Sequence, residues 1–97
     1  MLTKTEAMEL VSKKLLLDGH PDDQLVIVEQ YTIEKPFGWV FFFNSKKFLD
    51  TGIFRYRLLG NGPVIVNKVS GAVEFHGSNK PPEDIIKDYE RKLAEDS

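Results

Sequence analysis

An uninterrupted apolar run, Trp39–Phe43, constrains this chain more than any other part of its sequence. A strand with one face in water alternates apolar and polar side chains, so a run without a polar position must be covered on both faces. The run is also far too short to cross a bilayer, which takes about 20 residues. We therefore expect these residues to form the central strand of a sheet.

The length of the chain limits what can be packed around that strand. A chain of 97 residues buries roughly two-thirds of its unfolded surface, which allows one domain built around one core. The apolar fraction of 41% is enough to fill such a core and argues against disorder. We expect a single domain that covers residues 1–97.

Cysteine is absent from the sequence, which excludes disulfides and thiolate metal sites. A small domain without disulfides is more often cytosolic than secreted. The N-terminus carries acidic residues where a signal peptide would carry its apolar core. The sequence therefore predicts a cytoplasmic protein that is not inserted in a membrane.

Helices are predicted at both ends of the chain. Residues 3–6 read Thr-Lys-Thr-Glu and fit the capping box that begins a helix. The apolar residues that follow at helical spacing are Ala7, Leu10, Val11 and Leu15. Pro81 and Pro82 open the second predicted helix, because proline is favoured in a first turn. The apolar stripe of this helix consists of Ile85, Ile86, Tyr89 and Leu93.

Strands are predicted between the two helices. Residues 24–34 are rich in β-branched side chains, and Leu25, Ile27, Tyr31 and Ile33 fall on one face at period two, which indicates a strand. Residues 35–38, Lys-Pro-Phe-Gly, form a turn. Two short strands, Pro63–Asn67 and Ala72–His76, are joined by a turn in which Gly71 can take a positive φ. These segments predict an α+β fold of two layers, with the N-terminal and C-terminal helices packed on an antiparallel sheet of about four strands.

Residues 44–59 admit two structures. Phe54, Tyr56 and Leu58 alternate with arginines, as in an amphipathic strand, whereas Lys46–Leu49 could form a short helical turn. The sequence alone does not choose between them.

The net charge of −2 conceals a segregation of charge along the chain. Residues 35–82 carry seven Lys or Arg against two acidic residues, whereas both flanks are acidic. Cations and aromatics alternate within this basic segment, a composition that suits a nucleic-acid face or a protein interface. In a second interpretation the aromatics point into the core and only the arginines remain in water. The candidate partner-binding residues are Lys46, Lys47, Arg55, Tyr56 and Arg57.

No catalytic or cofactor-binding motif is present in the sequence. Residues 60–63, Gly-Asn-Gly-Pro, have the glycine content of a phosphate loop, but a strand-like segment follows where a helix is required, and Pro63 lacks an N–H. His20 and His76 are isolated, with no metal-ligand spacing around them. We therefore expect a protein without catalytic residues, a cofactor or a metal site.

Several segments in the second half of the chain resemble the bacterial YrhB-like family, also called immunity protein 35. They are GWVFFFNSKKFLDTG, which begins at Gly38, and LLGNGPVIVNKVSGAVEFHGSNKPPEDIIKDYE, which begins at Leu58. The resemblance covers about residues 36–90. Its signature residues in this chain, which we expect to be structural, are Gly38, Trp39, Gly60, Asn61, Pro63, Gly71, Pro81 and Tyr89.

The resemblance implies a bacterial immunity protein of a polymorphic toxin system. Such a protein binds its cognate toxin, in some systems a peptidase-like domain, and neutralises it by covering the active site or the substrate groove. The YrhB branch of the family implies an alternative, a chaperone-like stress protein that binds unfolded clients. A small nucleic-acid-binding module is a third hypothesis, and an enzyme is not implied.

Two further expectations concern the partners of the chain. Residues Ile53–Arg57 depart most from the family pattern. If this segment recognises the partner, the partner would differ from those of the relatives. An exposed edge strand such as Leu25–Ile33 could pair with its symmetry mate to form a homodimer.

Overall fold

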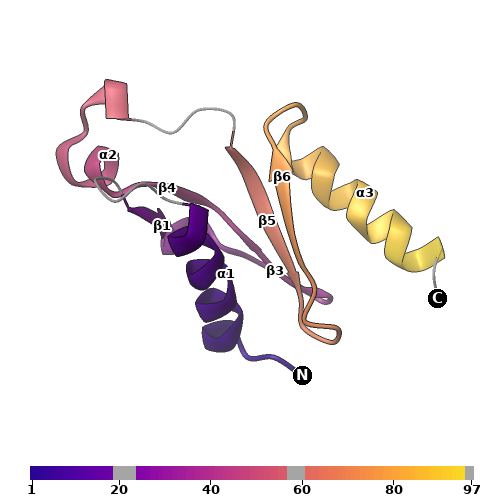
Figure 1. Cartoon of the computed structure of the whole chain (residues 1–97). Helices are drawn as coiled ribbons and strands as arrows, with labels where there is room; N and C mark the ends of the chain where they lie inside the picture. The colour runs from indigo at the N-terminus through magenta and orange to yellow at the C-terminus, as the bar shows by residue number, and fades with distance from the viewer. Residues whose placement is uncertain (19–23, 57–60, 96–97) are drawn as a thin grey trace.

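The structure, a computed structural model, describes residues 1–18, 24–56 and 61–95 (Figure 1). Its helical elements are α1 (Lys4–Asp18), η1 (Glu29–Tyr31), α2 (Lys46–Thr51), η2 (Phe54–Tyr56) and α3 (Pro82–Glu95), where η marks a 3-10 turn. Its strands are β1 (Leu25–Ile27), β2 (Ile33–Lys35), β3 (Gly38–Phe41), β4 (Phe43–Ser45), β5 (Asn61–Asn67) and β6 (Val73–Gly77). The helices predicted at both ends of the chain are confirmed. The strands predicted over Pro63–Asn67 and Ala72–His76 are confirmed as well.

The strands form two antiparallel sheets. The larger sheet has four strands in the order β2-β3-β5-β6, and the smaller one pairs β1 with β4. Within the larger sheet, Val40 of β3 lies opposite Ile33 of β2 and Ile65 of β5. The first part of the apolar run therefore occupies a central strand, as its composition predicts.

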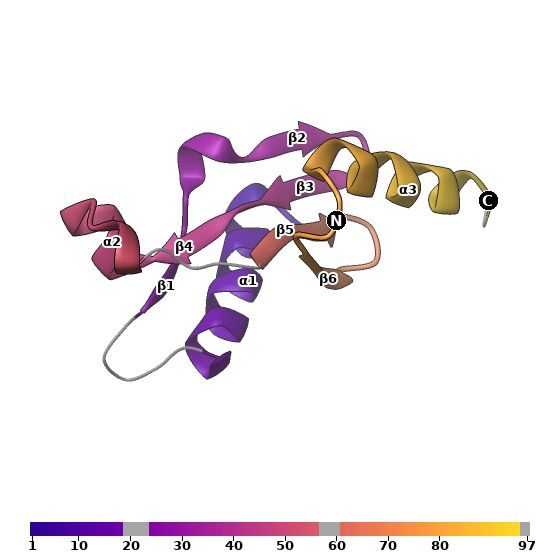
Figure 2. The same ribbon diagram turned by 90° about the horizontal axis from the view of Figure 1, so that it is seen from above.

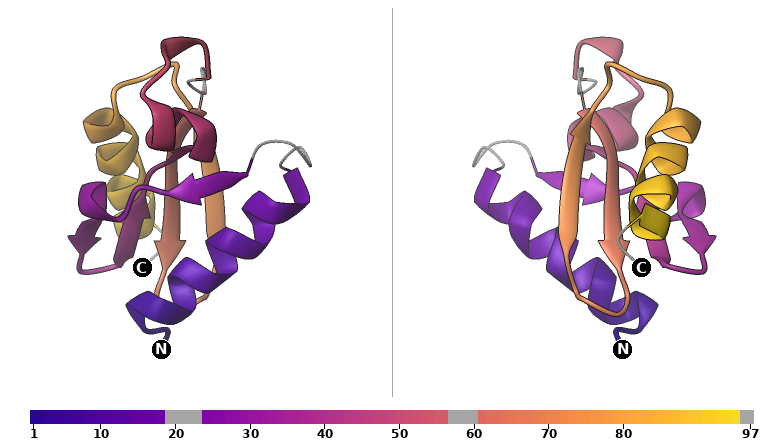
Figure 3. Two further views of the ribbon diagram at one scale, coloured as in Figure 1. Left: turned by 90° about the vertical axis from the view of Figure 1, so that its left-hand side faces the viewer. Right: turned by 90° about the vertical axis from the view of Figure 1, so that its right-hand side faces the viewer.

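Both faces of the four-stranded sheet are covered by a helix (Figure 3). One face packs against α1 in a cluster of buried side chains, namely Ala7, Val11, Leu15, Phe41, Val64 and Val66. The other face packs against α3 in a second cluster, namely Val40, Ile65, Ile85 and Ile86. The α+β class and the packing of both terminal helices on antiparallel strands are thus confirmed.

The structure has one layer more than the sequence predicts. Because α1 and α3 lie on opposite faces, the sheet is a middle layer between two helices, where we had expected two layers. The reason is the period of two in a strand, which points neighbouring residues to opposite faces. Val40 and Phe41 are neighbours and both fully buried, so each face of β3 needs its own cover.

The apolar run does not stay within one sheet. β3 ends at Phe41, and after Phe42 the chain continues as β4, in which Phe43 pairs with Ile27 of β1. The Phe42 carbonyl accepts a hydrogen bond from the Val28 N–H at 2.8 Å, which ties this junction to the segment between β1 and β2. The single strand expected over the run is therefore two strands.

The single strand predicted over residues 24–34 is wrong. β1 and β2 belong to different sheets and are separated by η1. At η1 the Tyr31 N–H donates to the Val28 carbonyl at 3.0 Å, a local bond that turns the chain. Leu25, Ile27, Tyr31 and Ile33 keep a period of two on both sides of the turn, and only Glu29 interrupts it, so periodicity alone did not reveal the turn. The continuous edge over Leu25–Ile33, on which we based a homodimer, is absent.

Local hydrogen bonds confirm the predicted capping box and turn. The Thr3 N–H donates to Glu6 Oε1 at 3.0 Å, and the Glu6 N–H donates to Thr3 Oγ1 at 3.2 Å. In the turn between β5 and β6, Gly71 takes a φ of 75°. Asn67 Oδ1 supports the same turn by accepting from the Val69 N–H at 2.9 Å.

Candidate partner-binding site

Residues 46–56, here called the arm, contain most of the predicted partner-binding residues. The arm consists of α2 and η2 and lies at the end of the molecule away from α3 (Figures 1 and 2). Of the two structures considered for this segment, the helical turn at Lys46–Leu49 is confirmed. The amphipathic strand is wrong for Phe54–Tyr56, which form a 3-10 turn.

Local hydrogen bonds explain why the arm is helical. Ser45 caps α2 by accepting from the Phe48 N–H at 3.3 Å. Gly52 ends α2 in the left-handed conformation, with a φ of 70°. Thr51 Oγ1 donates to the Lys47 carbonyl at 2.6 Å and so adds a bond to the last turn. These contacts join residues close in sequence, and one further bond, from the Lys46 N–H to the Gln24 carbonyl at 2.8 Å, ties the start of the arm to the residue before β1.

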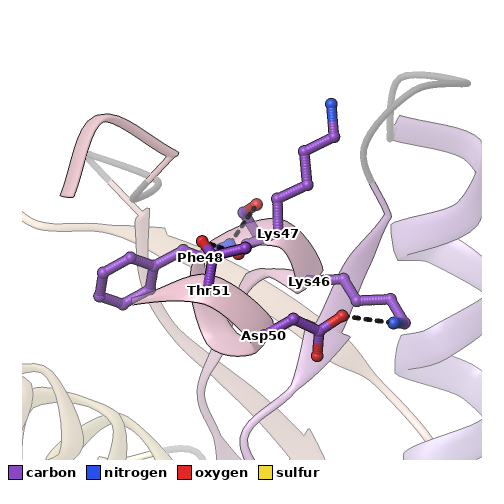
Figure 4. Close-up of polar contacts among 6 residues, drawn as sticks. Lys46, Lys47, Phe48, Asp50 and Thr51 are labelled. Carbon is purple, nitrogen blue, oxygen red and sulfur yellow. Dashed lines mark hydrogen bonds and ion pairs between the residues drawn. The ribbon is translucent and has the colours of Figure 1, made fainter. Parts of the chain in front are cut away.

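The side chains of Lys46, Lys47 and Phe48 diverge from α2 (Figure 4). Lys46 Nζ forms an exposed i,i+4 ion pair with Asp50 Oδ2 at 2.6 Å. Lys47 extends away from that pair. Of these two cations, Lys47 is therefore the better placed to meet a charge on a partner.

Lys47 and Arg55 both lie over the ring of Tyr56. Lys47 Nζ is 5.6 Å and the guanidinium carbon of Arg55 is 5.0 Å from the ring centroid. Arg55 Nη2 also donates to the Tyr56 hydroxyl at 3.1 Å. This hydrogen bond, followed by the charges of Arg55 and Lys47, lowers the pKa of Tyr56 from its ordinary value, because nearby cations favour the phenolate. We call these three residues the cation–aromatic cluster.

The arm thus holds four of the five predicted partner-binding residues, and Arg57 lies outside the described residues. The interpretation in which the aromatics of this segment point into the core is wrong for Phe54, whose side chain is 70% exposed. Its ring meets that of Phe48 edge-on, with centroids 6.3 Å apart. Leu49 and Ile53 are exposed on the same arm. The arm therefore presents apolar as well as cationic surface.

A cleft of about 880 Å³ adjoins the arm. β4 and α2 supply one part of its lining, residues 77–82 supply another, and the start of β5 contributes Gly62 and Pro63. The apolar and aromatic residues that line it are Val28, Tyr31, Phe42, Phe43, Phe48, Leu49, Pro63, Pro81 and Pro82. Concave surfaces with such a lining are where ligands and protruding partner side chains bind.

The sequence did not reveal this cleft, because its lining comes from segments that are far apart along the chain. The signal that was available is the repeated glycine and proline at Gly62-Pro63, Gly77 and Pro81-Pro82. Pro63 and Pro81 are among the signature residues expected to be structural, and both line the cleft.

Other signature residues have a place in the framework of the fold. Gly38 approaches β5 so closely that a Cβ there would lie 2.0 Å from the Val66 carbonyl oxygen. Tyr89 of α3 accepts a hydrogen bond from Asn67 Nδ2 at 3.2 Å, which ties α3 to the end of β5. Trp39 is half-buried against the core cluster on the α1 side.

The last two signature residues are Gly60 and Asn61. Asn61 begins β5 opposite Gly77, and Gly60 lies outside the described residues. Residues 61–67 form a strand, so Gly62 lies within β5, and the strand expected here, not a helix, is present. A phosphate loop of the kind that precedes a helix is therefore not formed here.

The described part of the chain contains no cluster of metal-ligating side chains, since no three His, Asp or Glu side chains there are grouped so that they could hold a metal ion. His76 Nε2 lies 3.4 Å from Glu74 Oε2, and His20 lies outside the described residues. No helix of the described ranges is long and apolar enough to span a membrane.

Comparison with known proteins identifies the family. The family model described as immunity protein 35 matches residues 5–91. The chain is also 46% identical over 57 residues to the uncharacterized protein YrhB of Escherichia coli (strain K12), an alignment that covers 59% of this chain and 61% of that relative. Less than two-thirds of the relative's length is thus matched, and no solved structure matches the chain. Because the family model covers most of the chain, the resemblance is confirmed and this protein belongs to the immunity protein 35 family.

Proposed function

We propose that this protein binds a cognate protein toxin and neutralises it by covering the toxin's active site or substrate groove. Its membership of the immunity protein 35 family supports a toxin as the partner. The observation that carries the proposal is the composition of the arm. No residue of α2 or η2 is buried, so the arm contributes its side chains to solvent and not to the core.

The residues of the arm are of the kinds that anchor protein interfaces. Arginine and aromatic residues are enriched at positions that contribute most to binding. The arm combines the cation–aromatic cluster with exposed Leu49, Ile53 and Phe54. An Arg guanidinium already held against Tyr56 loses less conformational freedom on binding than an unrestrained one. The cluster is therefore a suitable centre for an interface.

The charge of the arm indicates the chemistry of the surface that it meets. The described arm carries three positively charged residues and one negatively charged residue, a balance of +2; they are Lys46, Lys47 and Arg55, and Asp50. Complementary charge speeds encounter between partners and suppresses incorrect ones. We propose that the toxin presents an acidic surface to the arm.

The cleft extends the proposed contact surface beyond the arm. Phe48 and Leu49 belong to both the arm and the lining of the cleft, so a partner seated on one reaches the other. We propose that an apolar side chain of the toxin enters the cleft while its acidic surface meets the cation–aromatic cluster. Burial of such an anchor in a pocket is typical of the residues that dominate binding.

The experiment is affinity capture from the producing bacterium, followed by a test of neutralisation with the captured protein. The wild-type chain is compared with the arm variant K47A/R55A/Y56A and with K87A/K92A, which removes two exposed cations from α3. We expect the wild type and the α3 variant to retain one toxin and to abolish its activity. The arm variant should lose both capture and neutralisation.

Other outcomes separate the remaining hypotheses. Capture of many unrelated proteins together with suppression of their aggregation would favour the chaperone-like alternative. Capture of nucleic acid that weakens as salt rises would favour the nucleic-acid module, since phosphate contacts depend on salt. Full neutralisation by the arm variant would show that another surface binds the toxin.

We also propose a cytoplasmic location, because the chain has no cysteine and small domains without disulfides are more often cytosolic than secreted.

A further inference from the structure

β6 is an outer strand of the four-stranded sheet. It pairs with β5 on one side and stands last in the strand order β2-β3-β5-β6. Figure 3 shows it at the border of the sheet. An exposed strand edge presents N–H and C=O groups that can pair with a strand of another chain. This edge is separate from the arm, and within β6 only Gly77 also lines the cleft.

The register of β5 and β6 decides which backbone groups point outward. The Asn67 N–H donates to the Ala72 carbonyl at 3.0 Å, so these two residues form a hydrogen-bonded pair. Such pairs recur at every second residue of an antiparallel ladder, so Glu74 also directs its backbone groups toward β5. The N–H and C=O groups of Val73 and Phe75 therefore point outward, and we find no hydrogen bond to them from the described residues.

We propose that a second copy of this chain pairs antiparallel with β6, in a register centred on Phe75. Within β6, two antiparallel registers supply hydrogen-bond partners to the outward N–H and C=O groups of Val73 and Phe75. One is centred on Phe75 and the other on Glu74. A register centred on Glu74 places two glutamates directly opposite each other, and like charges destabilise a cross-strand pair.

The register centred on Phe75 is complementary to itself. It places Glu74 of each copy opposite His76 of the other copy, a pair whose attraction grows when the imidazole is protonated. It also brings together the two Phe75 residues, each 40% exposed in the single chain, where the ring meets that of Phe43 edge-on. The sequence of β6 therefore selects this register over the other.

The surroundings of Glu74 and His76 leave this pairing intact. Both residues line a hollow between β6 and α3. The other charged residues that line it are Lys80, Asp88, Arg91, Lys92 and Glu95. Lys80 Nζ and Arg91 Nη2 each lie 2.9 Å from an oxygen of Asp88, so these three satisfy one another. His76 Nε2 lies 3.4 Å from Glu74 Oε2 of its own chain without a hydrogen bond, and the His76 side chain is 31% exposed. Nε2 itself is buried, so the imidazole turns toward a second glutamate when the two copies pair.

The expected dimer is weak. β6 has five residues, so pairing two copies buries little surface, and interfaces of this kind belong to transient contacts. We expect sedimentation or light scattering to show a monomer at low concentration and a reversible dimer at high concentration.

A single engineered cysteine tests the register, because the chain contains no cysteine of its own. In the proposed register the two Cα atoms of residue 75 lie about 5.5 Å apart, within the range of a disulfide. Under mild oxidation we expect F75C to form a covalent dimer. The matched control E74C should stay monomeric, since residue 74 of one copy faces residue 76 of the other. A covalent dimer of E74C but not of F75C would overturn the register.

Charge exchange supplies a second test that leaves Phe75 unchanged. E74K places a cation opposite His76 at both symmetry-related pairs, and we expect it to weaken the dimer about tenfold. E74H/H76E exchanges the two residues and should restore the wild-type dimerisation constant. Circular dichroism confirms that each variant is folded. A wild-type chain that stays monomeric throughout the concentration series, or an E74K chain that dimerises as well as the wild type, overturns the proposal.

Discussion

In the sheet, Val40, Phe41 and Ile65 are fully buried, whereas in the arm no residue of α2 or η2 is buried. Both regions are rich in apolar and aromatic residues, so composition does not distinguish them. The sheet residues hold together segments that are distant in sequence. The arm is held by a cap, a left-handed glycine and side-chain bonds within a few residues of one another.

This difference separates the residues that fold the chain from those that are available to a partner. Apolar side chains in the sheet lower the free energy of folding by leaving water. Exposed Phe54, Ile53 and Leu49 do not, and large exposed apolar groups beside cations are typical of binding surfaces. Substitutions in the sheet should therefore change stability, and substitutions in the arm should change binding.

The largest effect on stability is expected from Phe41→Ala. Phe41 is fully buried between β3 and α1, so its removal leaves a cavity and should lower the free energy of unfolding by about 3–5 kcal/mol. Urea denaturation followed by circular dichroism measures this loss. Phe54→Ala in the arm is the matched control and should change the free energy of unfolding by less than about 0.5 kcal/mol. Equal losses from the two variants would contradict the contrast between sheet and arm.

The largest effect on binding is expected from the arm variant K47A/R55A/Y56A. A residue at the centre of an interface contributes about 2 kcal/mol or more, so loss of the cluster should weaken toxin binding by at least about 30-fold. Titration calorimetry with the captured toxin measures the affinity, and urea denaturation should show stability close to that of the wild type. Strong loss of stability with unchanged affinity would reverse the roles that we assign to the two regions.

Local sequence signals predicted several helix ends and turns of the fold. The capping box at Thr3, the proline at the start of α3 and the glycine between β5 and β6 act through neighbouring residues, and the structure contains each of them. The arm was harder because Phe54 and Tyr56 alternate with Arg55 as in a strand. Alternation over three positions is too short to distinguish a strand from a 3-10 turn, in which residues i and i+3 share a face.

The features that sequence could not reveal depend on contacts between distant residues. The break in the strand at Val28 is fixed by its hydrogen bond to Phe42, fourteen positions away. The placement of α1 and α3 on opposite faces depends on which side of β3 each helix reaches, and the pattern of either helix alone fits both sides. The cleft, too, exists only because β4, β5 and residues 77–82 meet in space.

A smaller loss of stability is expected from Thr3→Ala. Thr3 Oγ1 accepts from the Glu6 N–H, and α1 covers one face of the sheet, so loss of this cap should destabilise the chain by about 1 kcal/mol. The midpoint of urea denaturation should fall without a change in slope. Thr3→Ser keeps the hydroxyl and serves as the control. If both variants lose the same stability, the hydroxyl is not the cause.

A still smaller effect is expected from Lys46→Ala. Lys46 and Asp50 form an exposed i,i+4 ion pair, and such pairs contribute about 0.3–0.5 kcal/mol. Stability should change by no more than this, and the difference should shrink as salt rises. Because Lys46 is paired within α2, its loss should also weaken toxin binding less than Lys47→Ala does. A larger binding loss for Lys46→Ala would move the centre of the interface away from the cation–aromatic cluster.

The cluster can be followed without a partner through the titration of Tyr56. Arg55 donates to the Tyr56 hydroxyl and its charge favours the phenolate, so the pKa of Tyr56 lies below its ordinary value. Arg55→Gln removes the charge, and we expect the pKa of Tyr56 to rise toward that value. Lys47→Gln should raise it as well, but by less, because Lys47 lies over the ring and does not bond the hydroxyl.

Ultraviolet absorbance of tyrosinate measures this change. The difference between each variant and the wild type cancels the other two tyrosines, Tyr31 and Tyr89, and Lys87→Gln on α3 controls for a general loss of charge. If Arg55→Gln left the titration unchanged, Arg55 and Tyr56 would not be in contact in solution. The cluster would then lack the fixed geometry that favours it as the centre of the interface. If the titration shifts as expected, Arg55 holds the Tyr56 hydroxyl in solution through a contact between neighbouring residues, whereas the sheet is held by contacts between distant ones.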